Sequence, residues 1–135
     1  HSGSWLSWLG GDYSDTSYVS QSVTIPTGAP YLHYWYWIAS EDACGYDYFR
    51  IKLGTTTIHT KDLYGPQNTG GWVEGVVNLS AYAGTAKNLK FEVTTDSILN
   101  SNLFLDDVSF SGTASAFKGV IAPDDVNQDM ITRER

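Results

Sequence analysis

Consecutive aromatic residues in the segment YLHYWYWIAS, residues 31–40, are the first candidates for chemistry. Tyr34, Trp35, Tyr36 and Trp37 follow one another directly. Successive side chains of a β-strand point to opposite faces, so such a strand would bury one pair and present the other. Indole rings suit the apolar faces of sugars, and polar neighbours can bind the hydroxyl groups. The segment therefore predicts a sugar-binding face.

The alternation assigns each residue of this segment to a face. The aliphatic residues Leu32 and Ile38 share their face with Tyr34 and Tyr36, which we assign to the core. The outward face of this segment carries His33, Trp35 and Trp37. Tyr48 and Arg50, the outward residues of the segment DYFRIKLG, complete the candidate ligand-binding set. Trp5, Trp8 and Trp72 are further candidates whose faces the sequence does not assign. The alternative is that a loop, the chain end or a neighbouring domain covers the indoles, which would then be structural.

Carboxylates at core positions are the second group that could do chemistry. Asp47 and Asp106 alternate with apolar residues of their strands, Phe49, Ile51 and Leu53 in one and Phe104, Val108 and Phe110 in the other. An unpaired buried carboxylate is very costly. A calcium ion takes six to eight oxygen ligands and would satisfy both groups, and the loop SEDACGYD adds Glu41 and Asp42 nearby. The alternative is that these carboxylates lie at a sheet rim and accept backbone hydrogen bonds.

Catalytic motifs are not found. The sequence has no G-x-S-x-G nucleophile elbow and no H-E-x-x-H or Cys/His metal spacing. Asp106 and Asp107 are adjacent, so on a regular strand they point to opposite faces and do not form a close pair. We therefore expect a protein that is not an enzyme.

The elements that position these residues are expected to be strands. Short alternating runs are separated by Gly, Pro, Asn, Asp and Ser clusters. They cover residues 4–9, 17–25, 31–39, 46–53, 56–63, 72–79, 88–95 and 103–111. In the later runs, Leu89, Phe91 and Val93 are expected to face inward. The pattern predicts an all-β fold, an antiparallel sandwich of two sheets.

The strand pattern ends at Gly112. We expect residues 1–112 to form the module and residues 113–135 to be a C-terminal tail or linker. The alternative is that Phe117, Val120 and Ile121 dock on the sandwich, or that a short helix begins at Pro123.

Composition restricts the partners. The chain has 135 residues, enough for one domain, and a formal net charge of -7 with only eight Lys and Arg residues. Scattered basic residues argue against nucleic acid as a partner. No apolar run is long enough for a membrane span. A single cysteine, Cys44, excludes an intrachain disulfide.

Six segments also resemble a known family in their order. They are WLGG, SQSVTIP, YLHYWYWIASED with YDYFRIKLG, GWVEGVVNLSAYAG, LKFEVTTDS and LFLDDVSFSG, and the resemblance covers about residues 5–111. The chain resembles the MAM-like jelly-roll accessory domains of secreted bacterial proteins, which occur beside immune-inhibitor-A-type peptidases and glycosidases. It departs from eukaryotic MAM domains by lacking their cysteine framework.

The resemblance implies a jelly roll that works outside the cell. It also implies a structural calcium ion surrounded by the matching residues Glu41, Asp47 and Asp106. A polysaccharide or glycan is the favoured ligand, because related carbohydrate-binding jelly rolls carry an aromatic platform. The alternative is a structural or protein-interaction domain packed on a peptidase or glycosidase catalytic domain.

Overall fold

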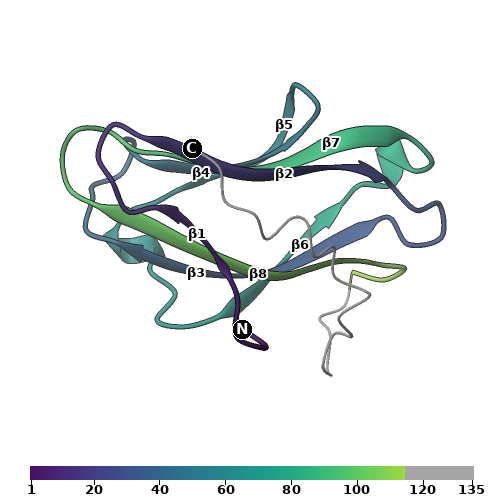
Figure 1. The fold of residues 1–135 in the computed structure, drawn as a ribbon, viewed down its shortest axis with the longest axis horizontal. Helices are drawn as coiled ribbons and strands as arrows, with labels where there is room; N and C mark the ends of the chain where they lie inside the picture. The colour runs from purple at the N-terminus through teal and green to yellow at the C-terminus, as the bar shows by residue number, and fades with distance from the viewer. Residues whose placement is uncertain (115–135) are drawn as a thin grey trace.

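Two antiparallel four-stranded sheets pack face to face in the computed structural model, which describes residues 1–114 (Figure 1). Sheet A has the strand order β1 (Ser7–Gly10), β8 (Ser101–Ser111), β3 (Tyr31–Ser40) and β6 (Val73–Asn78). Sheet B has the order β2 (Thr16–Thr24), β7 (Ala86–Thr94), β4 (Tyr48–Leu53) and β5 (Thr56–Asp62). Two short 3-10 turns, η1 (Gly65–Gln67) and η2 (Ser80–Tyr82), complete the described elements.

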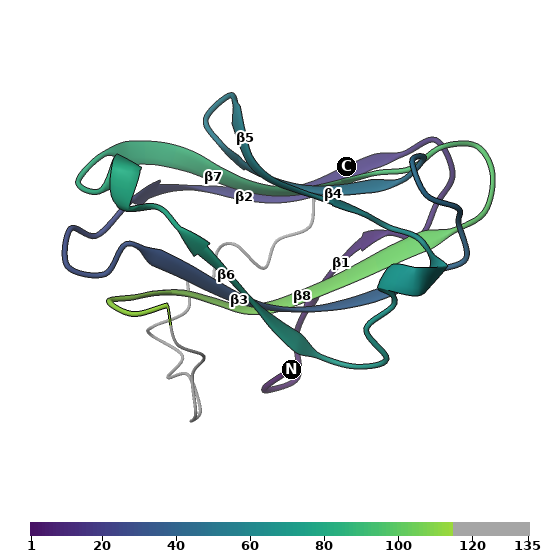
Figure 2. The ribbon, with the colours of Figure 1, turned by 180° about the vertical axis from the view of Figure 1, so that it is seen from behind.

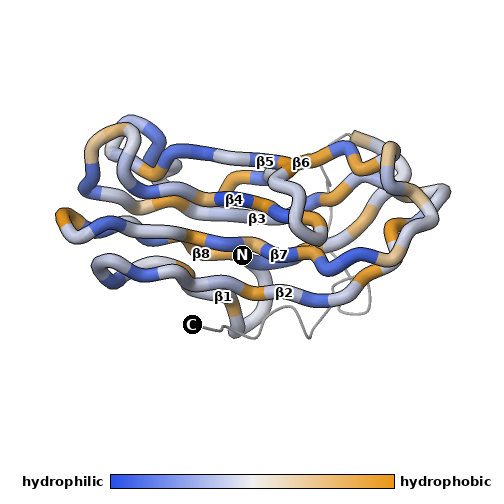
Figure 3. Tube along the Cα trace, turned by 90° about the horizontal axis from the view of Figure 1, so that it is seen from above, coloured by the Kyte–Doolittle hydropathy of each residue, from blue (hydrophilic) through white to orange (hydrophobic). Residues whose placement is uncertain are grey.

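The strand order is that of a jelly roll. Sheet A pairs the first strand with the eighth and the third with the sixth, while sheet B pairs the second with the seventh and the fourth with the fifth. Seen from above in Figure 3, the strands of the two sheets run in similar directions, as in aligned sandwiches. All eight expected strand runs overlap an observed strand, and the predicted fold class is confirmed. No helix in residues 1–114 has the length and apolar character that crossing a membrane requires.

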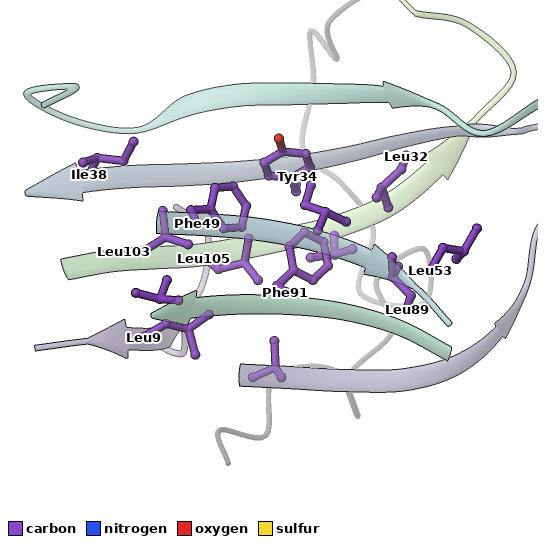
Figure 4. Close-up of a cluster of buried hydrophobic side chains, with 14 of the residues drawn as sticks. Leu9, Leu32, Tyr34, Ile38, Phe49, Leu53, Leu89, Phe91, Leu103 and Leu105 are labelled. Carbon is purple, nitrogen blue, oxygen red and sulfur yellow. The ribbon is translucent and has the colours of Figure 1, made fainter. Parts of the chain in front are cut away.

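The core lies between the sheets and contains the residues that alternation assigned to it in β3, β4 and β7 (Figure 4). Three aromatic rings form its centre. Tyr34 meets Phe91 edge-on with ring centroids 5.5 Å apart, and Phe91 stacks against Phe49 at 6.3 Å. Burial raises the pKa of the Tyr34 hydroxyl well above its usual range. Inward-facing Ile51, Leu53, Leu89 and Val93 are buried as predicted.

A β-bulge in β8 changes the face of half of that strand. His33 pairs with Ser109 and Trp35 with Asp106, so Asp107 and Val108 lie opposite the single residue Tyr34. Asp107 has a φ of 50°, outside the usual strand region. An extra residue shifts the alternation by one.

Because of this shift, the prediction that Phe104 and Asp106 face inward with Val108 and Phe110 is wrong. Leu103 and Leu105 fill the core instead. Phe104 and Asp106 pair with Trp37 and Trp35 and point outward with them.

The expected boundary at Gly112 falls close to the end of the described structure. The carbonyl oxygen of Thr113 lies 2.8 Å from Nε2 of His33, so the packed module includes this residue. Residues 115–135 contain most of the expected tail, together with Phe117, Val120, Ile121 and Pro123. They lie outside the described residues.

Candidate functional site

Four aromatic rings form a continuous row across the outer face of sheet A, which we name the aromatic ribbon. Its members are Trp8 of β1, Phe104 of β8, Trp37 of β3 and Trp72, which precedes β6. Neighbouring ring centroids are 6.2 Å apart for Trp8 and Phe104, 6.2 Å for Phe104 and Trp37, and 6.1 Å for Trp37 and Trp72. Trp8 is 44% exposed and Trp37 is 37% exposed, so the ribbon is open to solvent.

Trp35 lies on the same face but is covered. The imidazole of His1 stacks on its indole, with ring centroids 3.7 Å apart and planes 7° apart. The N-terminal segment is held by both carboxylates at the bulge. Asp107 accepts a hydrogen bond from the Ser2 hydroxyl at 2.6 Å and lies 2.7 Å from Nδ1 of His1, while Asp106 pairs with the main-chain nitrogen of His1.

The expectation that Asp106 and Asp107 point to opposite faces is therefore wrong. The bulge places Asp107 out of the regular alternation, and both carboxylates contact the same two residues, His1 and Ser2. A positive φ at position 107 gives no signal in the alternation of apolar residues, so the sequence pattern could not reveal it.

His33 points outward as expected, but it is buried rather than available to a ligand. Its Nδ1 lies 2.8 Å from Oε1 of Glu74, and its Nε2 lies 2.8 Å from the carbonyl oxygen of Thr113. Both ring nitrogens are thus engaged, and the side chain is fully enclosed. His33 joins β3 to β6 and to the chain after β8.

Tyr48 and Arg50 lie on the opposite surface of the molecule. Both belong to β4 in sheet B and point away from the core. The guanidinium of Arg50 lies over the Tyr48 ring at 4.7 Å, and its Nη1 donates to Oγ1 of Thr94 at 3.0 Å. They cannot share a site with Trp37, because the two sheets separate them. Alternation predicts which face of a strand is outward, but it does not say which sheet the strand joins.

A polar pocket of about 240 Å³ adjoins the aromatic ribbon where β3 ends and β8 begins. It is lined by Ala39, Ser40, Glu41, Asn68, Asn100 and Asn102. Asn102 links pocket and ribbon, because its Oδ1 accepts a hydrogen bond from Nε1 of Trp8 at 2.8 Å. The Glu41 side chain is exposed here. An indole beside amide and carboxylate groups offers both stacking and hydrogen bonding to a small polar ligand.

Three carboxylates meet at this same end of the sandwich, in what we name the aspartate cluster. It contains Asp42, Asp47 and Asp96, each of which offers an oxygen within 4.8 Å of the others. Asp47 is fully enclosed and its Oδ1 accepts a hydrogen bond from the main-chain nitrogen of Asp96 at 2.8 Å. Desolvation is the largest cause of the raised pKa of Asp47, and repulsion from Asp42 and Asp96 adds to it.

The calcium ligands that the family resemblance implies do not come together. Of Glu41, Asp47 and Asp106, only Asp47 belongs to the cluster. Glu41 lines the pocket, and Asp106 lies on the outer face of sheet A beside Trp35. The sequence analysis placed Asp42 near the proposed ligands but missed Asp96, which lies in a loop where side-chain alternation carries no information. The acidic side chain of Asp96 was the only available signal.

Comparison with known proteins gives no relative for this chain. No protein-family model matches it, and neither the curated proteins nor the solved structures contain a match.

Proposed function

We propose that this chain is a non-catalytic binding module that works outside the cell and binds a neutral carbohydrate on the outer face of sheet A. The observation that carries the proposal is the aromatic ribbon, whose rings cross the sheet from β1 to the start of β6 and whose Trp8 contacts the polar pocket. The motif resemblance to jelly-roll accessory domains supports the same ligand class and the same location.

A saccharide suits this surface better than a purely apolar ligand does. Indoles present broad apolar planes that lose little side-chain entropy on binding. The adjoining pocket supplies the carboxylate of Glu41 and the side chains of Asn68, Asn100 and Asn102, which can bind hydroxyl groups. The formal net charge of -7 would repel a polyanionic glycan, so we favour a neutral one.

The test is binding to an array of neutral glycans and to insoluble polysaccharides. Trp37→Ala should weaken binding at least about tenfold, or about 1.4 kcal/mol, which is the size of one aromatic contact. Trp8→Ala should do the same at the pocket end of the ribbon, and Glu41→Ala should weaken ligands that enter the pocket. Tyr48→Ala is the matched control, because it removes an aromatic ring from the outer face of sheet B.

Binding that survives the loss of both Trp8 and Trp37, with the fold intact by circular dichroism, would refute the ribbon as the site. Binding lost equally in the Tyr48 variant would also count against it, because that ring lies on the other surface.

A second candidate is a domain that packs against a neighbouring catalytic domain of a larger secreted protein. Trp5 is 79% exposed and Leu6 is 43% exposed, directly before the strand that carries Trp8. Together they add exposed apolar surface next to β1, as an interface would require. This function predicts that Trp5→Ser weakens association with the adjacent domain, and that no glycan binds the module.

A further inference from the structure

The geometry points to a divalent cation site, best suited to Ca²⁺, formed by Asp42, Asp47 and Asp96. These residues come from the loop after β3, the position before β4 and the loop after β7. Figure 2 shows the β3–β4 and β7–β8 connections at one end of the sandwich. The site uses none of the rings of the aromatic ribbon, adjoins the polar pocket through Ser40 and Glu41, and differs from the ligand set that the family resemblance implies.

Two buried oxygens of the cluster accept no well-formed hydrogen bond from residues 1–114, although the nearby Ser101 hydroxyl opposes the rise in the pKa of Asp47. They are Oδ2 of Asp47 and Oδ2 of Asp42. The other oxygen of each carboxylate accepts a main-chain hydrogen bond, from Asp96 to Asp47 and from Ala43 to Asp42 at 2.7 Å. Both side chains are more than nine-tenths enclosed. An enclosed acceptor without a donor is costly, and two such acceptors converging on one place call for a shared positive ligand.

No side-chain cation of the described chain takes this role. None of the ion pairs found within residues 1–114 involves Asp42, Asp47 or Asp96. Three carboxylates within 4.8 Å repel one another when ionised. A divalent ion bound here would reduce the repulsion between the carboxylates. It would also coordinate Oδ2 of Asp47 and Oδ2 of Asp42.

Neutral hydroxyl oxygens adjoin the two buried aspartates, Ser40 beside Asp42 and Ser101 beside Asp47. The hydroxyl of Ser40 lies 2.7 Å from that of Ser101 and donates to the carbonyl oxygen of Leu63 at 3.1 Å. The main-chain nitrogen of Asp42 donates to the same Ser40 hydroxyl at 3.0 Å. A ligand set of carboxylates and hydroxyls, completed by solvent water, would suit Ca²⁺, whereas Mg²⁺ demands a stricter octahedron and keeps more of its water.

Bound metal would add a link between two connections that hydrogen bonds already join, from the main-chain nitrogen of Glu41 to the carbonyl oxygen of Asn100 at 2.9 Å and from that of Asp96 to Asp47. It would tie the β3–β4 connection to the β7–β8 connection, and Asp42 is the direct neighbour of the pocket residue Glu41. The expected effect is therefore on stability first, through a ligand that binds only the folded state.

The test uses the full chain, stripped with a chelator and then titrated with CaCl2 while the melting temperature and the heat of binding are measured. We expect one equivalent of Ca²⁺ to bind and the melting temperature to rise by several degrees, with a much smaller rise for MgCl2 at the same concentration. Asp96→Asn should abolish both effects. Asp96 is less enclosed than Asp47, so this variant is the one expected to fold.

Asp106→Asn is the discriminating control. It should leave calcium binding intact if the aspartate cluster is the site, and should abolish it if the set implied by the resemblance is correct. The inference is overturned if calorimetry and elemental analysis find no bound Ca²⁺ in the intact chain, or if Asp96→Asn binds calcium as well as the unmodified protein does. Glycan binding is measured separately, so a failure here leaves the proposed carbohydrate surface untouched.

Discussion

The imidazole of His1 lies flat on the indole of Trp35, with centroids 3.7 Å apart and planes 7° apart. This contact extends the row of rings on sheet A, because His1 also meets Trp72 edge-on at 6.1 Å. It also keeps the face of Trp35 from solvent. The N-terminal segment therefore decides how much of the aromatic surface is open.

Replacing His1 by Ala should expose Trp35. The measurement is quenching of tryptophan fluorescence by acrylamide, which should increase in His1→Ala. The increase should be absent when His1→Ala is made in a Trp35→Phe background, since the newly exposed indole is then missing. If Trp35 contributes to the proposed sugar surface, glycan affinity should rise in the single variant. Equal quenching before and after the substitution would contradict the covering role of His1.

Gly75 should not tolerate a side chain. A Cβ at this position in β6 would collide with the ring of Tyr34, which is fixed in the core. We expect Gly75→Ala to lower the free energy of unfolding by about 1–3 kcal/mol, the usual cost of overpacking. Urea denaturation measures it, and Gly71→Ala is the matched control because its Cβ would meet open space. Similar losses in both variants would show that the Tyr34 contact is not the cause.

His59 should give the stability a pH dependence. Burial is the largest cause of its lowered pKa, and the positive charge of Lys61 adds to it. A group with a lower pKa in the folded state stabilises the protein above its unfolded pKa of about 6.5, and that contribution is lost as the pH falls through the folded value. His59→Phe keeps a ring beside Phe49, which His59 meets edge-on at 6.0 Å, and removes the titration.

Thermal melts of both proteins between pH 5 and pH 8 provide the measurement. The unmodified protein should lose more stability than His59→Phe as the pH falls below about 6.5. Parallel curves for the two proteins would show that His59 does not titrate differently in the folded state.

His33 should matter for stability and not for ligand binding. The His33 side chain is buried, and both of its ring nitrogens have partners, Glu74 and the carbonyl oxygen of Thr113. His33→Leu should therefore cost about 1–3 kcal/mol of unfolding free energy by removing both hydrogen bonds of the enclosed imidazole. Denaturant unfolding checks the first part, and glycan binding by the remaining folded protein checks the second. A variant that keeps its stability but loses binding would restore His33 to the ligand-binding set.

The local pattern of the sequence was sufficient for the strands and for most of the core. Side chains alternate with a period of two, so apolar residues at every second position identify both a strand and its inward face. Phe49 in β4 and Phe91 in β7 follow this rule and are buried as predicted. The outward direction of Trp35 and Trp37 follows from the same rule.

Only the tertiary structure decided how the faces combine into sites. One extra residue at Asp107 reverses the alternation in β8. The Asp107 side chain there contacts His1 and Ser2, about a hundred residues away in the sequence. Tyr48 and Arg50 separate from Trp37 because β4 joins the other sheet, a choice made by long-range strand pairing. Asp42 and Asp96 meet Asp47 because the sandwich brings two loops together at one end. The bulge, the sheet that β4 joins and the aspartate cluster all depend on contacts between segments distant in the chain. Alternation within one strand cannot predict such contacts.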